Sequence, residues 1–405
     1  MTVRLALRLA YFNLALFCVL LVGLEVAGQV LYFSWKGYPL AERSRHLLSK
    51  AEENPFEVHP FLAGRLRKNL KLTEDGKSIT TIEDHTRWTG ASTTNANAIR
   101  VALLGGSTTF GSGVTDAETW PARLQAILGS DYQVSNYGVP GYSTAENVIQ
   151  LALVVPESRP DIVVLYEGWN DIHNYHDTDL GVDYYAHGVR QYSNLAIQRP
   201  TPEGLFSKLG ELSVICRLAN VLSRKLFERS SSQPRAENPA YPPPDPAGNP
   251  SPDPFVDRLY VRNLGTLKAL ARHYGAFALF VPQVMDYSRF RGESGGWWTP
   301  HVQNAAMPRL VSRFNLLMKQ VCHPHEIGCT VLNDVTERHW TSDDFIDEGH
   351  FSAKGNLAFA QFLAPYIRDI GRSLPGSPSA EDSVTPSDRH DASVGHRSSL
   401  LAPQK

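Results

Sequence analysis

The sequence lacks any marked excess of charge and is poor in cysteine. Its 39 Lys and Arg residues nearly balance 41 Asp and Glu residues, for a formal net charge of −2. Nucleic-acid binding needs a concentrated basic surface, and this balance excludes nucleic acid as an expected partner. Four cysteines are too few for a disulfide framework, and no two show the CxxC spacing of a zinc or redox site. The cysteines therefore give no support to metal chemistry, and we expect neither a metal nor an organic cofactor.

Two of the cysteines, Cys322 and Cys329, lie close together in the segment VCHPHEIGC. A short-range disulfide between them is compatible with an oxidising compartment. Two ordinary free thiols are the alternative, and the sequence leaves both open.

The N-terminus carries an apolar run long enough to cross a membrane. Arg4 and Arg8 precede the run, which extends from Leu9 to Trp35 and contains Glu25 as its one charged residue. An acidic side chain at the centre of a span costs about 2.5 to 3.5 kcal/mol on insertion scales, so Glu25 is the unusual residue here. We predict that residues 1–35 form an uncleaved membrane anchor.

A cleaved signal peptide is the alternative interpretation of this N-terminus. Residues 14–24 would be its apolar core and residues 26–28 its cleavage site. The basic residues on the two sides do not fix an orientation, but one N-terminal span before a long C-terminal domain is the usual exported arrangement. We expect a single-pass protein of the cell membrane whose catalytic domain is extracytoplasmic, either periplasmic or at the cell surface.

Beyond the anchor, the sequence divides into a stalk with an irregular lead-in, over residues 36–97, and a domain over residues 98–372. Short runs rich in β-branched residues recur in this domain and predict buried strands. They cover residues 99–105, 132–138, 161–168, 276–283 and 329–335. Helical patterns lie between them, at residues 120–128, 144–155, 255–274 and 307–321. This alternation predicts an α/β fold, a three-layer α/β/α sandwich with a five-stranded parallel sheet.

The domain ends in a helix for which Ser352 is the expected N-cap and in which Pro365 is expected to introduce a kink. A long insertion, residues 172–253, interrupts the domain and ends in a Pro-rich segment, residues 231–254, that is typical of a mobile surface loop. Residues 373–405 are rich in Ser, Pro and Asp without periodicity, which predicts a disordered tail. The sequence contains no internal repeats.

Three Gly-containing segments each follow a predicted strand. Ser107 lies in LLGGSTTFGSG, Gly141 in NYGVPGYST and Asn170 in LYEGWNDIHN. The first segment is compatible with an exposed nucleophile, a phosphate-binding loop or a plain turn, although it lacks the Lys of a Walker A loop and the GxGxxG spacing. Gly141 and Asn170 are suited to donate to an oxyanion. The alternatives are a plain strand-to-helix turn at Gly141 and an Asn-Asp turn capped by its own side chains at Asn170.

A fourth segment, DEGHFSAKG, contains Asp347 and His350 just before the final helix. A serine hydroxyl is a weak nucleophile until a base takes its proton, and that base must be oriented by a third group. Asp347 could hold one imidazole nitrogen of His350 and leave the other to face Ser107. A surface loop or part of a metal site is the alternative for such a pair taken alone.

All four segments occur in order at the carboxyl ends of predicted strands, where they would converge. This ordered set resembles the SGNH (GDSL-like) hydrolase family over residues 98–372, with Ser107, Gly141, Asn170 and His350 in its four blocks. The resemblance implies a flavodoxin-like fold and a Ser107, His350 and Asp347 triad. It also implies an oxyanion hole made by Ser107, Gly141 and Asn170. Gly106 departs from the acidic residue that usually precedes the nucleophile, a position that does not accept the proton.

The resemblance favours a serine esterase that hydrolyses O-acyl or O-acetyl esters of a small molecule, a lipid or an envelope glycan. An O-acyltransferase of envelope polysaccharide and an inactive carbohydrate-binding module are the alternatives. Relatives with an N-terminal membrane segment and a GGST-type first block are often associated with envelope metabolism, which is an analogy only. Trp169, Trp297 and Trp298 lie in aromatic loops at the catalytic edge and are candidates for stacking on sugar rings, with simple packing as the alternative.

Overall fold

A parallel sheet of five strands forms the centre of the domain, as predicted. Its strands are β5 (Ile99–Gly105), β6 (Tyr132–Asn136), β7 (Ile162–Tyr166), β8 (Phe277–Phe280) and β9 (Cys329–Val331). They lie in the order β6-β5-β7-β8-β9, and every neighbouring pair is parallel. The connections that leave β5 and β7 therefore run in opposite directions, and ligands of such sheets bind outside the carboxyl ends of the strands at that point.

The computed structural model describes most of the domain and parts of the segments around it. The described residues are 3–43, 55–57, 59, 61–62, 64–91, 95–177, 180–182, 209–210, 212–231, 252–291, 302 and 304–374. Most of the Pro-rich segment and of the C-terminal tail lie outside these residues, so the predictions of mobility and disorder stay predictions.

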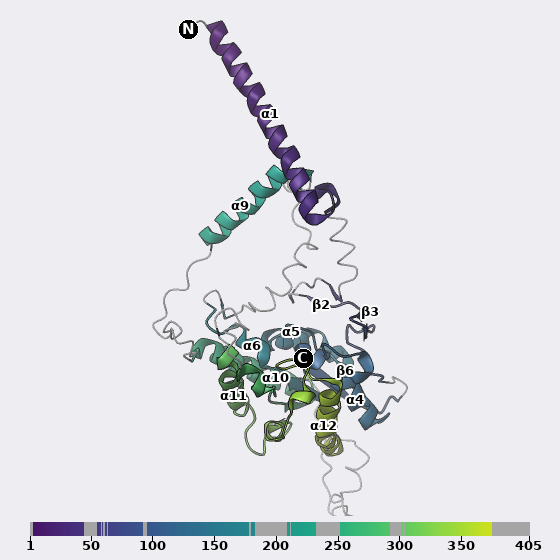
Figure 1. Cartoon of the computed structure of the whole chain (residues 1–405). Coiled ribbons are helices and arrows are strands. Elements are labelled where there is room, and N and C mark those ends of the chain that lie inside the picture. Colours follow the sequence, from purple (N-terminus) through teal and green to yellow (C-terminus); the bar gives the residue numbers. More distant parts are fainter. Residues whose placement is uncertain are drawn as a thin grey trace, which may run out of the picture.

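Helices cover both faces of the sheet and complete the predicted three layers (Figure 1). One face carries α4 (Trp120–Leu128) and α12 (Ala353–Ser373), and the other carries α5 (Thr144–Leu153), α10 (Pro254–His273) and α11 (Met307–Met318). Side chains alternate along β5, so that Val101 and Leu103 face the first pair of helices while Ala102 and Leu104 face the second group. Both faces are buried, which explains the continuous apolar runs in the sequence.

The ends of the helices follow the residues that the sequence offers for capping. Ser352 accepts a hydrogen bond from the backbone N–H of Gly355 at 3.2 Å and begins α12, as expected. The helix continues through Pro365 to Ser373. The N-terminal turn of α4 is fastened to α12 because Asn356 Oδ1 accepts the backbone N–H of Trp120 at 2.8 Å. Short 3-10 helices lie at Leu40–Glu42, Asp116–Glu118, Val155–Ser158, Tyr287–Arg291, Asn304–Ala306, Asn333–Thr336 and Ser342–Asp344.

The lead-in before the domain contains more regular structure than the sequence predicted. Two antiparallel pairs form there, β1 (Phe56–Glu57) with β2 (Arg65–Leu66), and β3 (Lys71–Glu74) with β4 (Lys77–Thr80). These strands are short and polar, so no apolar alternation marked them in the sequence. Leu62, Leu66 and Ile79 pack against Phe110 and Tyr142 of the domain. This part of the lead-in therefore belongs to the folded body.

Arg87 fastens the lead-in to the domain from a fully buried position. Its guanidinium donates to the backbone carbonyl oxygens of Phe110 (3.0 Å), Gly111 (2.7 Å) and Val114 (2.9 Å). It also forms an ion pair with Asp116, Nε to Oδ1 3.0 Å. These carbonyl groups follow Ser107 within a few residues, so one buried cation holds the end of the first block in place.

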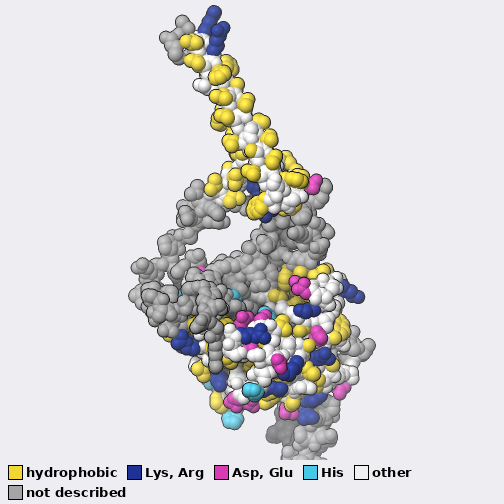
Figure 2. Space-filling view, in the orientation of Figure 1, with side chains coloured by type: hydrophobic (Ala, Val, Ile, Leu, Met, Phe, Trp, Pro, Cys, Tyr) yellow, Lys and Arg dark blue, Asp and Glu magenta, His cyan; other side chains and the backbone are white. Residues whose placement is uncertain are grey.

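Two helices extend away from the domain (Figure 1). Helix α1 (Val3–Lys36) contains a candidate membrane span, Arg8–Lys36, and its apolar side chains are exposed along its length (Figure 2). Helix α9 (Val214–Ser231) forms in the long insertion, where the sequence analysis predicted no helix, and it contacts α1.

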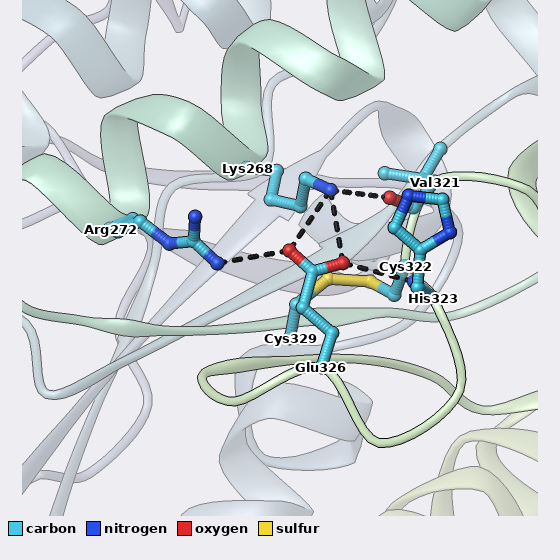
Figure 3. Close-up of a disulfide and its surroundings, with 7 residues drawn as sticks. All are labelled: Lys268, Arg272, Val321, Cys322, His323, Glu326 and Cys329. Atoms are coloured by element: carbon cyan, nitrogen blue, oxygen red, sulfur yellow. Dashed lines mark hydrogen bonds and ion pairs between the residues drawn. A yellow bond between two sulfur atoms is a disulfide. The ribbon is translucent and has the colours of Figure 1, made fainter.

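The loop before β9 is closed by a disulfide between Cys322 and Cys329, which the sequence had left open (Figure 3). The same loop is held to α10 by Glu326, whose carboxylate pairs with Lys268 at 3.1 Å and Arg272 at 3.0 Å. A covalent and an ionic link thus fix the approach to the edge strand.

Replacing Arg87 by Met is expected to destabilise the protein by about 3 to 5 kcal/mol, because Asp116 and three carbonyl groups would lose their buried cation. The measurement is the free energy of unfolding from urea titration. Arg100→Met is the matched control, since the Arg100–Asp161 pair is partly exposed and should contribute less than about 1 kcal/mol. Equal effects of the two substitutions would contradict the anchoring role of Arg87.

Candidate active site

The first block begins where β5 meets the short helix α3 (Ser107–Phe110). Gly105 has a φ of +155°, and a Cβ there would lie 2.4 Å from the carbonyl oxygen of Tyr166. The chain can leave the sheet this sharply only because Gly105 has no side chain. Ser107 follows at the carboxyl end of β5 and is partly exposed.

The fourth block is a tight turn that Asp347 organises with both of its carboxylate oxygens. Oδ1 accepts the backbone N–H groups of Gly349 at 2.9 Å and His350 at 2.7 Å, while Oδ2 lies 2.7 Å from Nδ1 of His350. A backbone bridge between Phe345 and Phe351 closes the turn. One side chain therefore folds the loop and orients its imidazole.

The imidazole of His350 meets the hydroxyl of Ser107. His350 Nε2 lies 2.7 Å from Ser107 Oγ, across a sequence separation of 243 residues. The three predicted side chains thus form a continuous path, carboxylate to imidazole to hydroxyl. Such a path can move a proton from the hydroxyl to the imidazole while the carboxylate holds the imidazole in one tautomer.

The charge on Asp347 suits this position. Its partial burial would raise the pKa of the carboxyl, but the hydrogen bonds and charge of His350, together with the Gly349 amide, outweigh that effect. The pKa of Asp347 is therefore below its ordinary value. The carboxylate stays ionised at neutral pH and can stabilise a positive imidazolium.

The second and third blocks meet at the backbone of Tyr142. The amide nitrogen of Asn170, in α6 (Trp169–Ile172), donates to the carbonyl oxygen of Tyr142 at 2.7 Å. Gly141 immediately precedes Tyr142 and has a φ of +80°. The second N–H of the Asn170 amide has no hydrogen bond to a described residue and could donate to a substrate. The predicted residues of blocks one to three thus lie together at the carboxyl edge.

Glu167 is a residue of this site that the sequence analysis missed. It ends the β7 segment, is almost fully buried, and uses Oε1 to accept the backbone N–H groups of Gly168 at 2.9 Å and Asn170 at 3.2 Å. It therefore positions the segment that carries the Asn170 amide. An acidic residue at the end of an otherwise apolar strand was the available sequence signal.

The space beside Gly106 is filled by these same side chains. A Cβ at Gly106 would lie 2.3 Å from Asn170 Nδ2 and 2.7 Å from Glu167 Oε2. Both distances are far shorter than real Cβ contacts, so this position admits only glycine while Asn170 and Glu167 stay where they are. The departure from the usual acidic residue at this position therefore has a packing reason.

Three buried carboxyl groups lie beneath the edge of the sheet. Burial raises the pKa of Glu146 and Asp171 to about 7 each, and that of Glu167 well above its ordinary value, with the charge of Asp171 adding to the effect on Glu167. Asp171 accepts hydrogen bonds from the backbone N–H and hydroxyl of Thr144 and so ties α6 to α5. Burial therefore favours the neutral form of Glu167 over the charged form.

The aromatic residues predicted to bind substrate are less accessible than the sequence suggested. Trp169 is 7% exposed, and its ring packs against Gly349, in the turn between Asp347 and His350. This burial favours the packing alternative, and sugar stacking by Trp169 stays a prediction. Trp297 and Trp298 lie outside the described residues. In the described part of the chain, no three His, Cys, Asp or Glu side chains gather as a metal site requires.

One family model matches most of the domain. Residues 103–358, more than half of the chain, match the model of the GDSL-like Lipase/Acylhydrolase family. Among solved structures, TesA is 15% identical, with 67% of this chain and 99% of TesA covered and a TM-score of 0.34. Axe2, an acetylxylan esterase from Geobacillus stearothermophilus, is 14% identical, with coverages of 70% and 97% and a TM-score of 0.36. No curated protein matches. Likenesses this distant say nothing about the substrate.

Gly106→Ala is expected to reduce activity by a factor of about 10² to 10³, the usual effect of losing one oxyanion donor, because the added methyl group would displace Asn170. The measurement is kcat/KM on p-nitrophenyl acetate, with a thermal melt to confirm folding. Gly265→Ala is the control, since open space surrounds Gly265 in α10, and activity should be unchanged. An active Gly106→Ala variant would contradict this account of the site.

Glu146→Gln tests the buried carboxyl groups through pH. An acid whose pKa rises on folding stabilises the fold fully below its unfolded pKa and loses that contribution as pH rises through its folded pKa. For Glu146 this window runs from 4.5 to about 7. The unfolding free energy of the wild type should therefore fall relative to Glu146→Gln between pH 5 and pH 8 in urea titrations. A constant difference would contradict the raised pKa.

Proposed function

The chain belongs to the GDSL-like lipase/acylhydrolase family, and from this premise we propose that it is a serine esterase that works through an acyl-enzyme intermediate. One observation carries the proposal, the two contacts of the His350 imidazole. Its Nε2 lies 2.7 Å from Ser107 Oγ, and its Nδ1 lies 2.7 Å from Asp347 Oδ2. Proton transfer in catalysis requires this hydrogen-bonding distance between nucleophile, base and orienting acid.

In the proposed reaction, Ser107 Oγ attacks the carbonyl carbon of an ester while its proton passes to Nε2 of His350. Asp347 holds the Nδ1–H and stabilises the imidazolium that forms. The tetrahedral intermediate then collapses, its C–O bond to the alcohol breaks, and His350 returns the proton to the leaving alkoxide. The products of this half-reaction are an alcohol and an acyl-Ser107 ester.

The oxyanion of that intermediate would be held by three donors, the backbone N–H groups of Ser107 and Gly141 and the side-chain amide of Asn170. Two contacts support the role of Asn170: Glu167 holds its backbone N–H, and the Tyr142 carbonyl holds one side-chain N–H. Donors that are fixed before the reaction need no reorganisation as charge develops. Each contributes about 2.7 to 4 kcal/mol to the transition state.

The second half-reaction separates two candidate functions. If water attacks the acyl-enzyme, with His350 as base, the protein is an esterase; if a sugar hydroxyl attacks, it is an O-acyltransferase of an envelope polysaccharide. The second candidate is favoured only by the partly exposed turn at Asp347 and His350, which a bulky acceptor could reach. An inactive carbohydrate-binding module is opposed by the intact Ser107, His350 and Asp347 path.

We also propose that the protein is anchored in the cell membrane by α1, with its catalytic domain outside the cytoplasm, and that it acts on an O-acylated glycan or lipid. The length of the span and its exposed apolar surface support the anchor. The bridge between Cys322 and Cys329 supports an oxidising compartment.

Ser107→Ala is expected to lower kcat by a factor of about 10⁴ or more and to abolish covalent labelling by a fluorophosphonate probe. His350→Ala should have a similar effect on kcat, and Asp347→Asn a smaller one, because Asn still holds the turn but not the charge. The measurements are steady-state hydrolysis of p-nitrophenyl esters and mass spectrometry of the labelled peptide. Retained labelling in Ser107→Ala would refute Ser107 as the nucleophile.

The esterase and the transferase differ in their products. Wild-type protein incubated with an acyl donor should release the free acid at a rate independent of added acceptor oligosaccharide. A transferase would instead form O-acylated oligosaccharide, and its release of free acid would fall as the acceptor concentration rises. Quantifying both products by mass spectrometry decides between the two.

A further inference from the structure

Glu25, the acidic residue inside the apolar helix α1, has specific partners in the insertion. Its carboxylate accepts hydrogen bonds from Ser213 Oγ at 2.8 Å and from the backbone N–H groups of Val214 at 2.8 Å and Ile215 at 3.1 Å. Gln29, one turn further along α1, donates to Glu25 at 2.7 Å and to the carbonyl oxygen of Leu212 at 2.8 Å. The one charged residue of the apolar run is therefore fully engaged.

These contacts cap α9 from another helix. The first N–H groups of a helix have no partner within it and attract a negative charge. In α9, Glu25 takes two of these N–H groups, and Ser213 Oγ accepts the N–H of Cys216 at 3.2 Å. A side chain on Gly28 would meet Val214 at 3.0 Å, so the two helices also approach closely here. Hydrogen bonds and close packing together fix the start of α9 on α1.

The surface of α9 is amphipathic, and beyond Val214, which packs on α1, its apolar side is exposed. Val214, Leu218, Val221 and Leu222 follow the i, i+4, i+7, i+8 spacing of one helix face. Leu218 is 57% exposed and Leu222 is 60% exposed. The sequence of the helix is also basic, with a single acid, Glu228, against the residues Arg217, Arg224, Lys225 and Arg229. Exposed leucines beside basic residues are typical of helices that lie in a membrane interface.

The position of α9 along α1 matches the edge of a bilayer. A hydrocarbon core takes about 20 helical residues, roughly Leu9 to Gly28 when counted from the end of the N-terminal basic residues. Glu25 and Gly28 then fall in the last turn within the core. The aromatic residues Tyr32 and Trp35 follow, as expected of an interfacial belt. Figure 1 shows α9 leaving α1 near its domain-proximal end and running across it rather than along it.

We propose that α9 lies in the membrane–water interface as a second contact with the bilayer, that it binds anionic lipid headgroups, and that Glu25 holds it there. This inference rests on the proposed anchoring by α1. The exposed leucines of its apolar face contact the acyl boundary, and the basic sequence of the helix attracts it to anionic headgroups. The insertion that carries α9 follows α6, which holds Asn170, so the second contact also links the active-site edge of the domain to the membrane.

The test uses the full chain in vesicles of phosphatidylcholine and phosphatidylglycerol. In a background of Cys18→Ser and Cys216→Ser, with the disulfide intact, an environment-sensitive fluorophore is attached to Leu20→Cys, Leu222→Cys or Asn220→Cys. Lipids with quenchers at shallow or deep positions then report depth. The fluorophore at position 20 should be quenched by the deep lipid. The fluorophore at position 222 should be quenched by the shallow lipid several-fold more than the one at position 220, which lies on the opposite face of α9.

The role of Glu25 is tested in the same assay. Glu25→Leu should reduce shallow quenching at position 222 to the level at position 220 while position 20 stays quenched. Glu25→Gln, which keeps an acceptor oxygen, should retain most of the quenching at position 222. Equal quenching in Glu25→Leu and the wild type would overturn the holding role.

The outcomes separate this proposal from the others. Quenching at position 20 without quenching at position 222 would overturn the interfacial helix and leave the anchor intact. Absence of quenching at position 20 would overturn the anchor and this inference together. Position 222 could also be protected from an aqueous quencher by a second copy of the chain. In that case the protection would disappear on dilution, and this result would also overturn the interfacial helix. Fluorophosphonate labelling of Ser107 reports the esterase function independently of all three.

Discussion

The contact between Ser107 and His350 joins two residues that are 243 positions apart, and the described fold is organised so that they meet. The strand order brings the ends of β5 and β7 together at the point where the connections diverge. Asp347 fastens the turn that carries His350 by accepting two backbone N–H groups. The geometry of the proposed catalytic path thus depends on the sheet at one end and on a single carboxylate at the other.

The proposed oxyanion side of the site depends on a different constraint, the burial of acidic groups. Glu167 accepts the backbone N–H of Asn170, and burial raises the pKa of the Glu167 carboxyl well above its ordinary value. The same side chain occupies the space next to Gly106, which explains why glycine precedes Ser107. The buried carboxyl group of Glu167 therefore positions Asn170, while the carboxylate of Asp347 remains ionised beside the imidazole of His350.

The contact between α1 and the insertion repeats this use of one acid to organise distant segments. Glu25 is costly in an apolar span, and its cost is offset because three donors of the insertion surround it. Helix α1 and the insertion are thereby linked at a defined point. With the proposed anchoring, the active-site edge of the hydrolase domain would be connected to the bilayer through the insertion as well as through the lead-in.

Local patterns in the sequence determined the elements of the domain and the candidate residues. The apolar run at 99–105 and the helix at 120–128 agree with β5 and α4 to the residue, and Ser352 caps α12 as expected. Such features are encoded within a few neighbouring residues. Only the tertiary structure revealed Glu167 behind Asn170, the packing reason for Gly106, the anchoring by Arg87 and the capping of α9 by Glu25. These features depend on contacts between segments far apart in the chain, and no periodicity or spacing within one segment records them.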